Sequence, residues 1–270
     1  MNQQQRLDYL SAMGVQIWLQ HTLTHDDVDK QKSVLTQSVT TIATEEVATI
    51  NKSEAPIQII CTSNSRPTWD ELRDQVTACT TCVLHKTRIQ TVFGVGNQQA
   101  DWMIIGEAPG AQEDQQGEPF VGRAGMLLNE ILFSLDLQRN AVFIANILKC
   151  RPPNNRDPLP NEVAACATFL KQQVEHVAPR IILALGRIAA QNLLQTSESI
   201  GRLRGRVHNY HSIPVIVLYH PAYLLRSPLE KRKVLQDLLL AQQTLKQTNN
   251  NTMSDVIKKQ QSRSLNDLLD

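Results

Sequence analysis

The chain has 270 residues, of which 41% are apolar and 20% are charged, and its formal net charge is +1. This length allows one large or two modest domains, and the apolar share is sufficient for a sizeable core. No stretch approaches the ~18 uninterrupted apolar residues of a membrane span, and the N-terminus lacks the basic start and apolar run of a secretory signal. We therefore expect a soluble cytoplasmic protein without membrane contact.

Composition divides the chain into a polar extension, a folded unit and a polar tail. Residues 1–66 begin with a short apolar-rich segment at 7–19 and continue through Gln, Thr, Ser, Asp and Lys with few aromatic residues, as linkers do. Residues 67–245 carry the apolar periodicity of a folded domain, and residues 246–270 are again polar. We expect a flexible N-terminal extension and a disordered C-terminal tail.

Apolar runs of strand length alternate with helical patterns inside the folded unit. The predicted strands span residues 102–105, 142–147, 181–185 and 215–218. The predicted helices span residues 124–135, 161–177, 187–195 and 229–245. This alternation predicts an α/β fold with a mainly parallel sheet and helices on both faces. Functional residues are then expected in loops at the carboxyl ends of the strands.

Three loops at those strand ends carry unusual sequences. GEAPGAQEDQQGEPFVGRAG (106–125) follows the first strand, NILKCRPP (146–153) follows the second and YHPAYLLR (219–226) follows the fourth. The first loop has the glycines of a phosphate loop but lacks its lysine, and it carries the carboxylates Glu107, Glu113, Asp114 and Glu118. A phosphate site is therefore not the natural interpretation of this acidic loop.

The five cysteines lie in a chain without an export signal, which argues against a disulfide framework. Cys79 and Cys82 form a C-x2-C pair, whereas Cys150 and Cys166 are single cysteines on either side of a proline-rich loop. Four thiolates can hold tetrahedral zinc or an iron–sulfur cluster, and the spacing does not choose between them or exclude incidental core cysteines. Cys61, in the polar extension, is expected to be a free thiol.

Six separate motifs follow one another along the chain. They are GEAPGAQED-x3-EPFVGRAG, NILKCRPPNNRDP, the single Cys166, ALG at 184–186, GRLRG at 201–205 and HPAYLLR at 220–226. Together, over roughly residues 69–245, the chain resembles the family 4 uracil-DNA glycosylases, which are iron–sulfur members of their superfamily. The resemblance implies a three-layer α/β/α fold with a short, mainly parallel four-stranded sheet. It also implies a DNA-repair enzyme that flips uracil out of DNA and hydrolyses its N-glycosidic bond, leaving an abasic site.

The resemblance assigns cofactor and pocket residues. It makes Cys79, Cys82, Cys150 and Cys166 the ligands of a structural 4Fe-4S cluster, with zinc as the alternative metal. It assigns Gly106, Phe120, Asn146 and His220 to the uracil pocket. In this assignment Phe120 is the stacking face, and the Asn146 carboxamide accepts from uracil N3–H and donates to O4, whereas cytosine presents the opposite pattern. His220 donates to O2, where negative charge develops as the bond breaks.

The catalytic carboxylate is less clearly specified. Glu107 is the first candidate to orient or deprotonate the attacking water, because of its place in GEAPG. Glu113 either lines the C5 edge of the base and excludes the thymine methyl group, or helps to position the water. Asp114 is expected to cap a turn or helix, and Glu118 is expected on the loop surface. A negative charge near the sugar suits the cationic transition state.

Basic residues near the later loops are candidates for phosphate contacts. From Arg139 to Lys233 the chain holds 14 Lys and Arg residues against 5 Asp and Glu residues. The predicted DNA-binding residues are Arg202, Arg204, Arg206 and Arg226, with Leu224 and its neighbour Leu225 at the place of a wedge that fills the gap in the duplex. The alternative for each of these residues is an ordinary surface position without a DNA contact.

The expected partner is uracil-containing DNA, single- or double-stranded, and the protein is expected to be a monomer of the bacterial cytosol and nucleoid. Residues 7–19 have apolar side chains at helical spacing and are a candidate docking peptide for a replication or repair protein. The alternative is a simple tether that binds no partner. Two other functions are a uracil-DNA trap without turnover and a replication-associated accessory domain. The trap is disfavoured because NILKCRPPNNRDPLPNEV lacks the histidine-containing loop of the trapping proteins.

Overall fold

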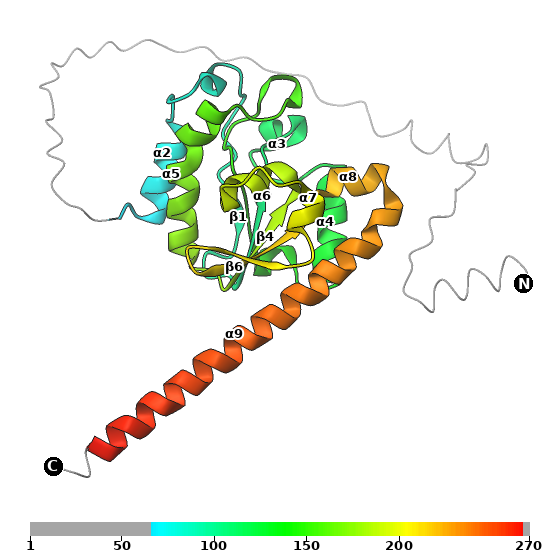
Figure 1. Ribbon diagram of the computed structural model, residues 1–270. Coiled ribbons are helices and arrows are strands. Elements are labelled where there is room, and N and C mark those ends of the chain that lie inside the picture. Colours follow the sequence, from blue (N-terminus) through cyan, green and yellow to red (C-terminus); the bar gives the residue numbers. More distant parts are fainter. Residues whose placement is uncertain (1–65, 267–270) are drawn as a thin grey trace, which may run out of the picture. The chain divides into compact units, whose positions relative to one another are not determined.

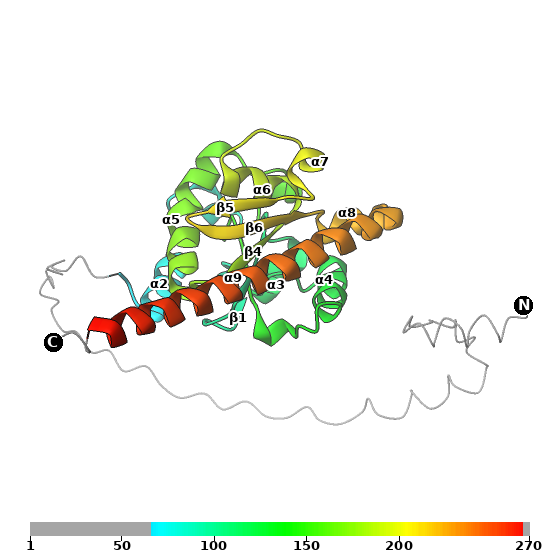
Figure 2. The same cartoon turned by 60° about the horizontal axis from the view of Figure 1, so that its bottom comes forward.

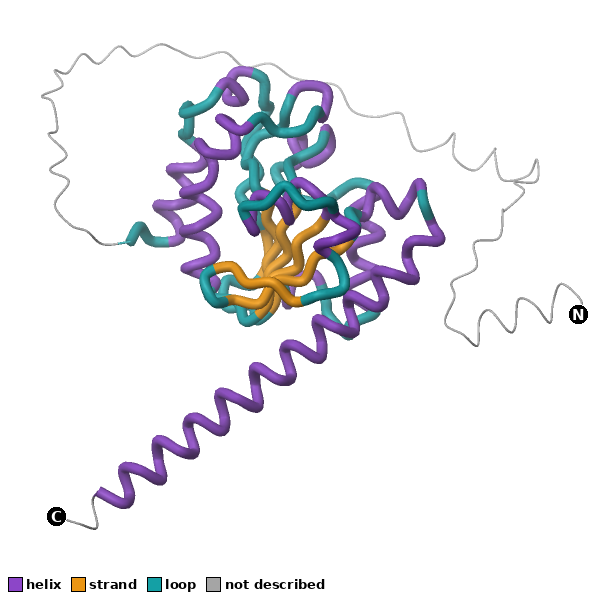
Figure 3. Tube along the Cα trace, in the orientation of Figure 1, coloured by secondary structure: helices purple, strands orange, loops and turns teal. Residues whose placement is uncertain are grey.

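Six strands form one sheet in the computed structural model, which describes residues 66–266 of the chain and the side chains of residues 66–248. Their order across the sheet is β1 (Val95–Gly96), β3 (Phe143–Asn146), β2 (Trp102–Gly106), β4 (Ile181–Leu185), β6 (Ile213–Leu218) and β5 (Val207–Tyr210). The four central strands are parallel and both edge strands are antiparallel. Figure 3 shows the strands gathered in the middle of the domain. The predicted strands are these four central ones, so the expectation of a four-stranded sheet is corrected to six.

The two edge strands escape prediction for physical reasons. β1 has only two residues. β5 has the mixed sequence VHNY and is partly exposed along its length, as edge strands are. Its hairpin to β6 turns at His211 and Ser212, which both have positive φ (46° and 69°). Neither is the glycine or asparagine that normally signals such a turn.

Helices cover both faces of the sheet, as the alternation predicts (Figure 1). One face packs on α4 (Arg123–Phe133), α8 (Pro221–Arg226) and the first part of α9 (Lys231–Asn266). The other packs on α5 (Pro160–Val177) and α6 (Gly186–Leu194). Figure 2 shows the sheet between these two layers from a second direction. β2 and β4 are buried along their whole length because both of their faces are covered.

Short helices complete the domain. α2 (Trp69–Thr77) packs beside α5, with Leu72, Val76 and Phe93 in a small cluster of their own. α3 (Ala111–Gln116) and α7 (Ile200–Leu203) lie in the loops after β2 and α6. Single 3-10 turns occur at Val83–Lys86, Arg139–Ala141, Pro153–Asn155 and Pro228–Glu230. No helix of the described residues is long and apolar enough to cross a membrane.

The last helix differs from its prediction. Predicted to end at Leu245, α9 continues to Asn266 and so runs through most of the stretch expected to be a disordered tail. Residues 229–266 contain neither glycine nor proline, so the local sequence holds no strong stop signal. The predicted extension over residues 1–66 lies, except for Arg66, outside the described residues, as do Cys61 and the candidate docking segment 7–19.

Arg204 joins the start of α9 to the loop before β5. Its Nε donates to Asp237 Oδ2 at 2.7 Å, its Nη2 donates to the carbonyl oxygen of Lys233 at 2.6 Å, and its guanidinium lies 4.5 Å from the ring centroid of Tyr219. The two charged side chains are 10% and 1% exposed. Burial raises the pKa of Asp237, while Arg204 opposes that shift. The fold itself thus occupies this guanidinium with internal partners, and the predicted phosphate contact of Arg204 stays a prediction.

Replacing Asp237 with alanine should lower the free energy of unfolding by about 3 kcal/mol, because it leaves a buried guanidinium unpaired. Glu198→Ala is the matched control, since it breaks the exposed pair with Arg206 and should cost less than about 1 kcal/mol. Urea unfolding followed by circular dichroism measures both changes. Equal losses in the two variants would contradict the structural role of Arg204.

Candidate active site

Three parallel strands end at one cavity of about 490 Å³. Asn146 is the last residue of β3, and His220 follows β6 by two residues. Phe120 comes from the long loop after β2. All three line the cavity together with Glu107, Glu113, Tyr223 and Arg226. The structure therefore brings together side chains from all three loops identified in the sequence.

Gly106 lies against two residues that line this cavity, Asn146 and Phe120. It ends β2 and lies opposite Asn146 in the parallel register of β2 and β3. A Cβ atom added to Gly106 would overlap Asn146 Oδ1 and would lie 2.6 Å from Cζ of Phe120. Any side chain here would displace the carboxamide or the ring. Glycine is thus needed for a close approach, which is a role other than the phosphate contact its motif first suggests.

Asn146 presents an unsatisfied acceptor. Its side chain is 2% exposed, and its Oδ1 has no hydrogen-bond partner among the described residues. A buried polar atom without a partner costs about 1–3 kcal/mol, so such atoms generally mark a place where a ligand or water completes the bond. The backbone oxygen of the same residue accepts from Lys149 Nζ at 2.7 Å. The main chain is therefore held while the side-chain oxygen is left for a donor.

Phe120 is held in an uncommon conformation. Its φ is 55°, in the left-handed region, which bulky residues rarely adopt and which costs about 1–3 kcal/mol. Gly125 in α4 approaches its carbonyl group so closely that any Cβ there would overlap it. The Phe120 ring stacks on the His220 ring, with centroids 5.6 Å apart and planes inclined by 30°. The strained backbone thus sets a flat apolar ring against the cavity.

Glu113 and Arg139 hold the main chain on either side of Phe120. One oxygen of Glu113, Oε1, accepts from the backbone N–H groups of Val121 (3.0 Å) and Gly122 (3.2 Å). Arg139 donates from Nη2 to the carbonyl oxygen of Pro119. Glu113 also lines the cavity, so its predicted contact with the base or the water stays a prediction. The structure adds a second role, in which the carboxylate anchors the stacking loop.

His220 is oriented by the helix that it starts. It is the N-cap of α8, and its Nδ1 accepts from the backbone N–H of Ala222 at 3.2 Å. Because an amide can only donate, a neutral His220 carries its proton on Nε2. Burial lowers the pKa of His220 to about 4, Arg226 lowers it further, and Glu113 acts in the opposite direction. At neutral pH the ring is therefore an uncharged donor through Nε2.

Glu107 has an unusually basic carboxylate. Burial raises the pKa of Glu107 to about 7, the charge of Asp157 raises it too, and Arg187 opposes both. Asp157 and Arg187 form an exposed ion pair at 2.6 Å. The carboxylate is thus divided between its two protonation states near neutral pH, as is suitable for a group that exchanges a proton with water.

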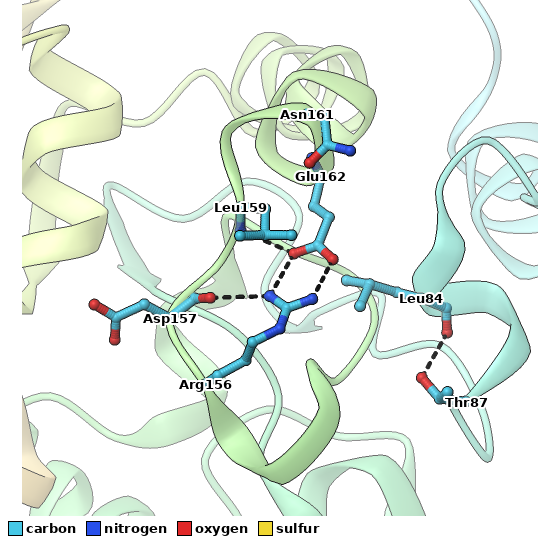
Figure 4. A network of polar contacts seen from close by, with 7 residues as sticks. All are labelled: Leu84, Thr87, Arg156, Asp157, Leu159, Asn161 and Glu162. Atoms are coloured by element: carbon cyan, nitrogen blue, oxygen red, sulfur yellow. Dashed lines mark hydrogen bonds and ion pairs between the residues drawn. The ribbon is translucent and has the colours of Figure 1, made fainter.

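The loop that brings Asp157 to the cavity is fixed by a buried carboxylate. Arg156 donates to both oxygens of Glu162 at 2.9 and 2.6 Å, and to the carbonyl oxygen of Asp157 at 3.0 Å (Figure 4). Glu162 also accepts from the backbone N–H of Leu159 at 2.9 Å, as Figure 4 shows. Its side chain is fully buried, and the hydrogen bond from Arg156 lowers its pKa. This bidentate pair shapes the cavity wall formed by the proline-rich loop.

Three of the four motif cysteines share one apolar cluster, and Cys79 is not part of it. Cys150 and Cys166 are buried, and they pack with Cys82, Leu84 and Leu148 in one small apolar cluster. Burial raises the pKa of Cys150, as do the charges of Cys82 and Cys79, and Arg88 lowers it through a hydrogen bond from Nη1 to Cys150 Sγ at 3.0 Å. Within residues 66–248, no group of three or more His, Cys, Asp or Glu side chains is arranged to hold a metal ion.

The predicted DNA-binding residues fall into different environments. Arg226 is exposed and lines the cavity mouth, and Arg202 is also exposed. Arg206 is exposed but pairs with Glu198 at 2.6 Å. Leu224 is only 1% exposed and packs in the core, so its prediction as a wedge is wrong. The reason is the register of α8, which turns Leu224 inward and leaves its neighbours Tyr223 and Leu225 at the surface.

Several residues at the site have no individual signal in the sequence. Arg139 and Arg187 act through partners 20 and 30 residues away in the chain. Arg156 acts through Glu162, six residues further along, at the start of α5. Tyr223 lies within the HPAYLLR motif but has no role assigned from it. Its ring packs against Tyr219 with centroids 5.0 Å apart. Only the positions of the motifs at strand ends could have suggested these side chains.

The sequence of this chain matches that of a known family of enzymes. A sequence profile described as the Uracil DNA glycosylase superfamily matches residues 93–239. The chain belongs to this superfamily.

The similar proteins narrow the class. The type-4 uracil-DNA glycosylase of Archaeoglobus fulgidus is 46% identical over 167 residues, which is 59% of this chain and 84% of that protein. The type-4 enzyme of Saccharolobus solfataricus is 45% identical over 177 residues (62% and 82%), and that of Thermotoga maritima is 43% identical over 177 residues (64% and 92%). Within the superfamily the chain is thus of the type-4 kind, and it is a hydrolase of N-glycosyl bonds that excises uracil from DNA.

Gly106→Ala should reduce kcat/KM for uracil excision by about a hundredfold, because the added methyl group displaces the Asn146 carboxamide or the Phe120 ring and misplaces the base. Gly201→Ala is the matched control, since its Cβ would meet nothing within 4 Å. Excision from a uracil-containing oligonucleotide measures both variants. A fully active Gly106→Ala enzyme would show that the base does not depend on the positions of Asn146 and Phe120.

Proposed function

We propose that the cavity holds a uracil flipped out of DNA, stacked on Phe120 and read by Asn146. The supporting observation is the buried, unpaired Oδ1 of Asn146. Uracil N3–H is a donor that would satisfy this atom, whereas the N3 of cytosine is an acceptor that would leave it unpaired. Burial makes such a mismatch costly, so one carboxamide supplies strong discrimination between the two bases.

His220 is proposed to stabilise the departing base. Cleavage of the N-glycosidic bond leaves negative charge on uracil O2, and a fixed donor in a buried site stabilises that charge strongly. The bond from Ala222 N–H to Nδ1 supports an Nε2–H donor. A neutral imidazole keeps this proton during the reaction, so the electrostatic role needs no proton transfer.

Glu107 is proposed as the residue that orients and activates the water. Glu113 is the rival carboxylate, but its Oε1 already accepts two backbone hydrogen bonds. Glu107 has a half-buried carboxylate whose pKa is raised to about 7 by burial and by the charge of Asp157. When ionised, it would also stabilise the positive charge that develops on the sugar. Glu113 is then an anchor of the Phe120 loop, in addition to its predicted place at the C5 edge.

The four cysteines are proposed to hold a 4Fe-4S cluster with a structural role. Burial raises the pKa of Cys150 and of Cys166, so ionised thiolates at these two buried positions need a compensating positive charge, which a metal centre supplies. A cluster binds each thiolate to a separate iron atom and so separates them more widely than a single zinc ion with ~2.3 Å bonds. The resemblance to the iron–sulfur family supports a cluster over zinc. Arg88 would donate to a cluster ligand.

DNA is proposed to approach the mouth of the cavity. Arg226 and Arg202 would contact phosphates, and Arg206 would do so after releasing Glu198. Tyr223 or Leu225 would fill the gap left by the flipped base, in place of Leu224. We further propose that the protein acts as a monomer in the cytosol, and that residues 7–19, outside the described part of the chain, contact a replication or repair protein.

Asn146→Ala and His220→Ala should each slow uracil release by about 10²–10³-fold, because the first removes the hydrogen bond that positions the base and the second removes the donor to the charge that develops on O2. The assay incubates the protein with single- and double-stranded uracil-containing oligonucleotides and measures abasic sites. The visible absorbance of the cluster should stay unchanged in both variants and disappear in Cys150→Ser. Loss of absorbance in the first two variants would mean that they are structural residues. A stable DNA complex without release by the unmodified protein would indicate a trap.

The single-turnover rate should rise with pH and level off above about 7, because the pKa of Glu107 is raised to about 7 and only its ionised form activates water. Glu107→Gln should remove this inflection and lower the rate by about 10²–10⁴-fold. His220 stays neutral over the same range. Glu113→Gln is the matched control, because its amide oxygen can still accept from Val121 and Gly122. An inflection that persists in Glu107→Gln, or disappears in Glu113→Gln, would overturn the assignment.

A further inference from the structure

A buried lysine lies directly behind the base-reading residue. Lys149 is 1% exposed. A lysine is almost never buried unless its ammonium group has partners. Its Nζ donates to the backbone oxygen of Asn146 at 2.7 Å and to Gln173 Oε1 at 2.6 Å. Gln173 is itself fully buried, and its Nε2 donates to the carbonyl oxygen of Phe93 at 2.8 Å. These three side-chain bonds form a short polar chain through the apolar core.

The contact with Asn146 falls where the backbone leaves the sheet. The next two residues are hydrogen-bonded to the end of β2 and the residue that follows it. Ile147 N–H donates to the Gly106 oxygen at 3.0 Å, and Leu148 N–H donates to the Glu107 oxygen at 3.1 Å. The carbonyl group of Asn146 itself is held from behind by Lys149. The main chain that carries the base-reading carboxamide is therefore fixed from two sides.

We propose that Lys149 is a positioning residue for uracil recognition, which fixes the main chain of Asn146 so that its side-chain oxygen faces the base. This inference rests on the proposed role of Asn146. The Nζ group donates through N–H bonds whether it is an ammonium or an amine, so the role depends on geometry alone. A methionine fills a similar volume but has no donor, and it would leave the buried Asn146 carbonyl group without this bond.

The alternative is that Lys149 merely fills the core. Gln173 separates the two cases, because Lys149→Met and Gln173→Leu both break the Lys149–Gln173 bond. Only Lys149→Met also breaks the bond to Asn146. The double variant replaces both partners with apolar side chains, which restores much of the lost stability because no polar side-chain group of the pair is left unsatisfied.

The test measures the inhibition constant of free uracil in the 270-residue chain, with melting temperature and visible absorbance recorded for every variant. Lys149→Met should raise this constant about tenfold, equivalent to about 1.4 kcal/mol. The double variant should recover melting temperature but keep the raised constant. The inhibition constant of Gln173→Leu should stay within about twofold of that of the unmodified protein, well below the tenfold rise expected for Lys149→Met. An unchanged constant in Lys149→Met, or an equal rise in Gln173→Leu, would overturn the proposal.

Two comparisons separate this inference from other failures. If Asn146→Ala raises the inhibition constant while Lys149→Met does not, the inference about Lys149 fails and the role of Asn146 stands. If Asn146→Ala leaves the constant unchanged, the role of Asn146 itself is wrong, and with it the inference. A Cys166→Ser variant controls for cluster loss. The proposal is also overturned if Lys149→Met lowers the visible absorbance and raises the inhibition constant only as much as Cys166→Ser does.

Discussion

The parallel pairing of β2 with β3 sets Gly106 opposite Asn146, and the geometry of the site depends on this register. A slip of one residue would turn Asn146 to the other face of the sheet. The absent side chain of Gly106 leaves room for the Asn146 carboxamide and the Phe120 ring to meet. The glycine at the end of β2 thus allows the polar side chain of Asn146 and the apolar ring of Phe120 to lie close together.

Burial gives the two titratable groups at the cavity complementary properties. It lowers the pKa of His220 to about 4 and raises that of Glu107 to about 7. The histidine is then a neutral donor at the base, and the glutamate is a carboxylate that can exchange its proton near physiological pH. The same exclusion of water strengthens the interaction of each group with the charge that develops beside it. The acidic loop that is unsuitable for phosphate therefore suits a reaction with a cationic sugar.

Much of this arrangement follows from the sequence. The four central strands are apolar runs buried on both faces, and parallel strands bring their loops to one edge, so the motifs were expected to meet. Features that depend on contacts between distant residues were not accessible. Nothing in the sequence near Arg204 indicates its internal partner Asp237, which lies in a later helix. Leu224 and Leu225 differ in exposure only through the register of a short helix. Lys149 looks like an ordinary lysine of a basic loop, whereas the fold buries it.

The central claim is that the unpaired oxygen of Asn146 and the Nε2–H of His220 face the same base. A crystal structure of the protein with free uracil tests it most directly. We predict the ring on Phe120, with N3 within ~3.2 Å of Asn146 Oδ1 and O2 within ~3.2 Å of His220 Nε2, the usual limit for such bonds. Uracil bound elsewhere, or in this cavity with its N3 edge turned away from Asn146, would contradict the account.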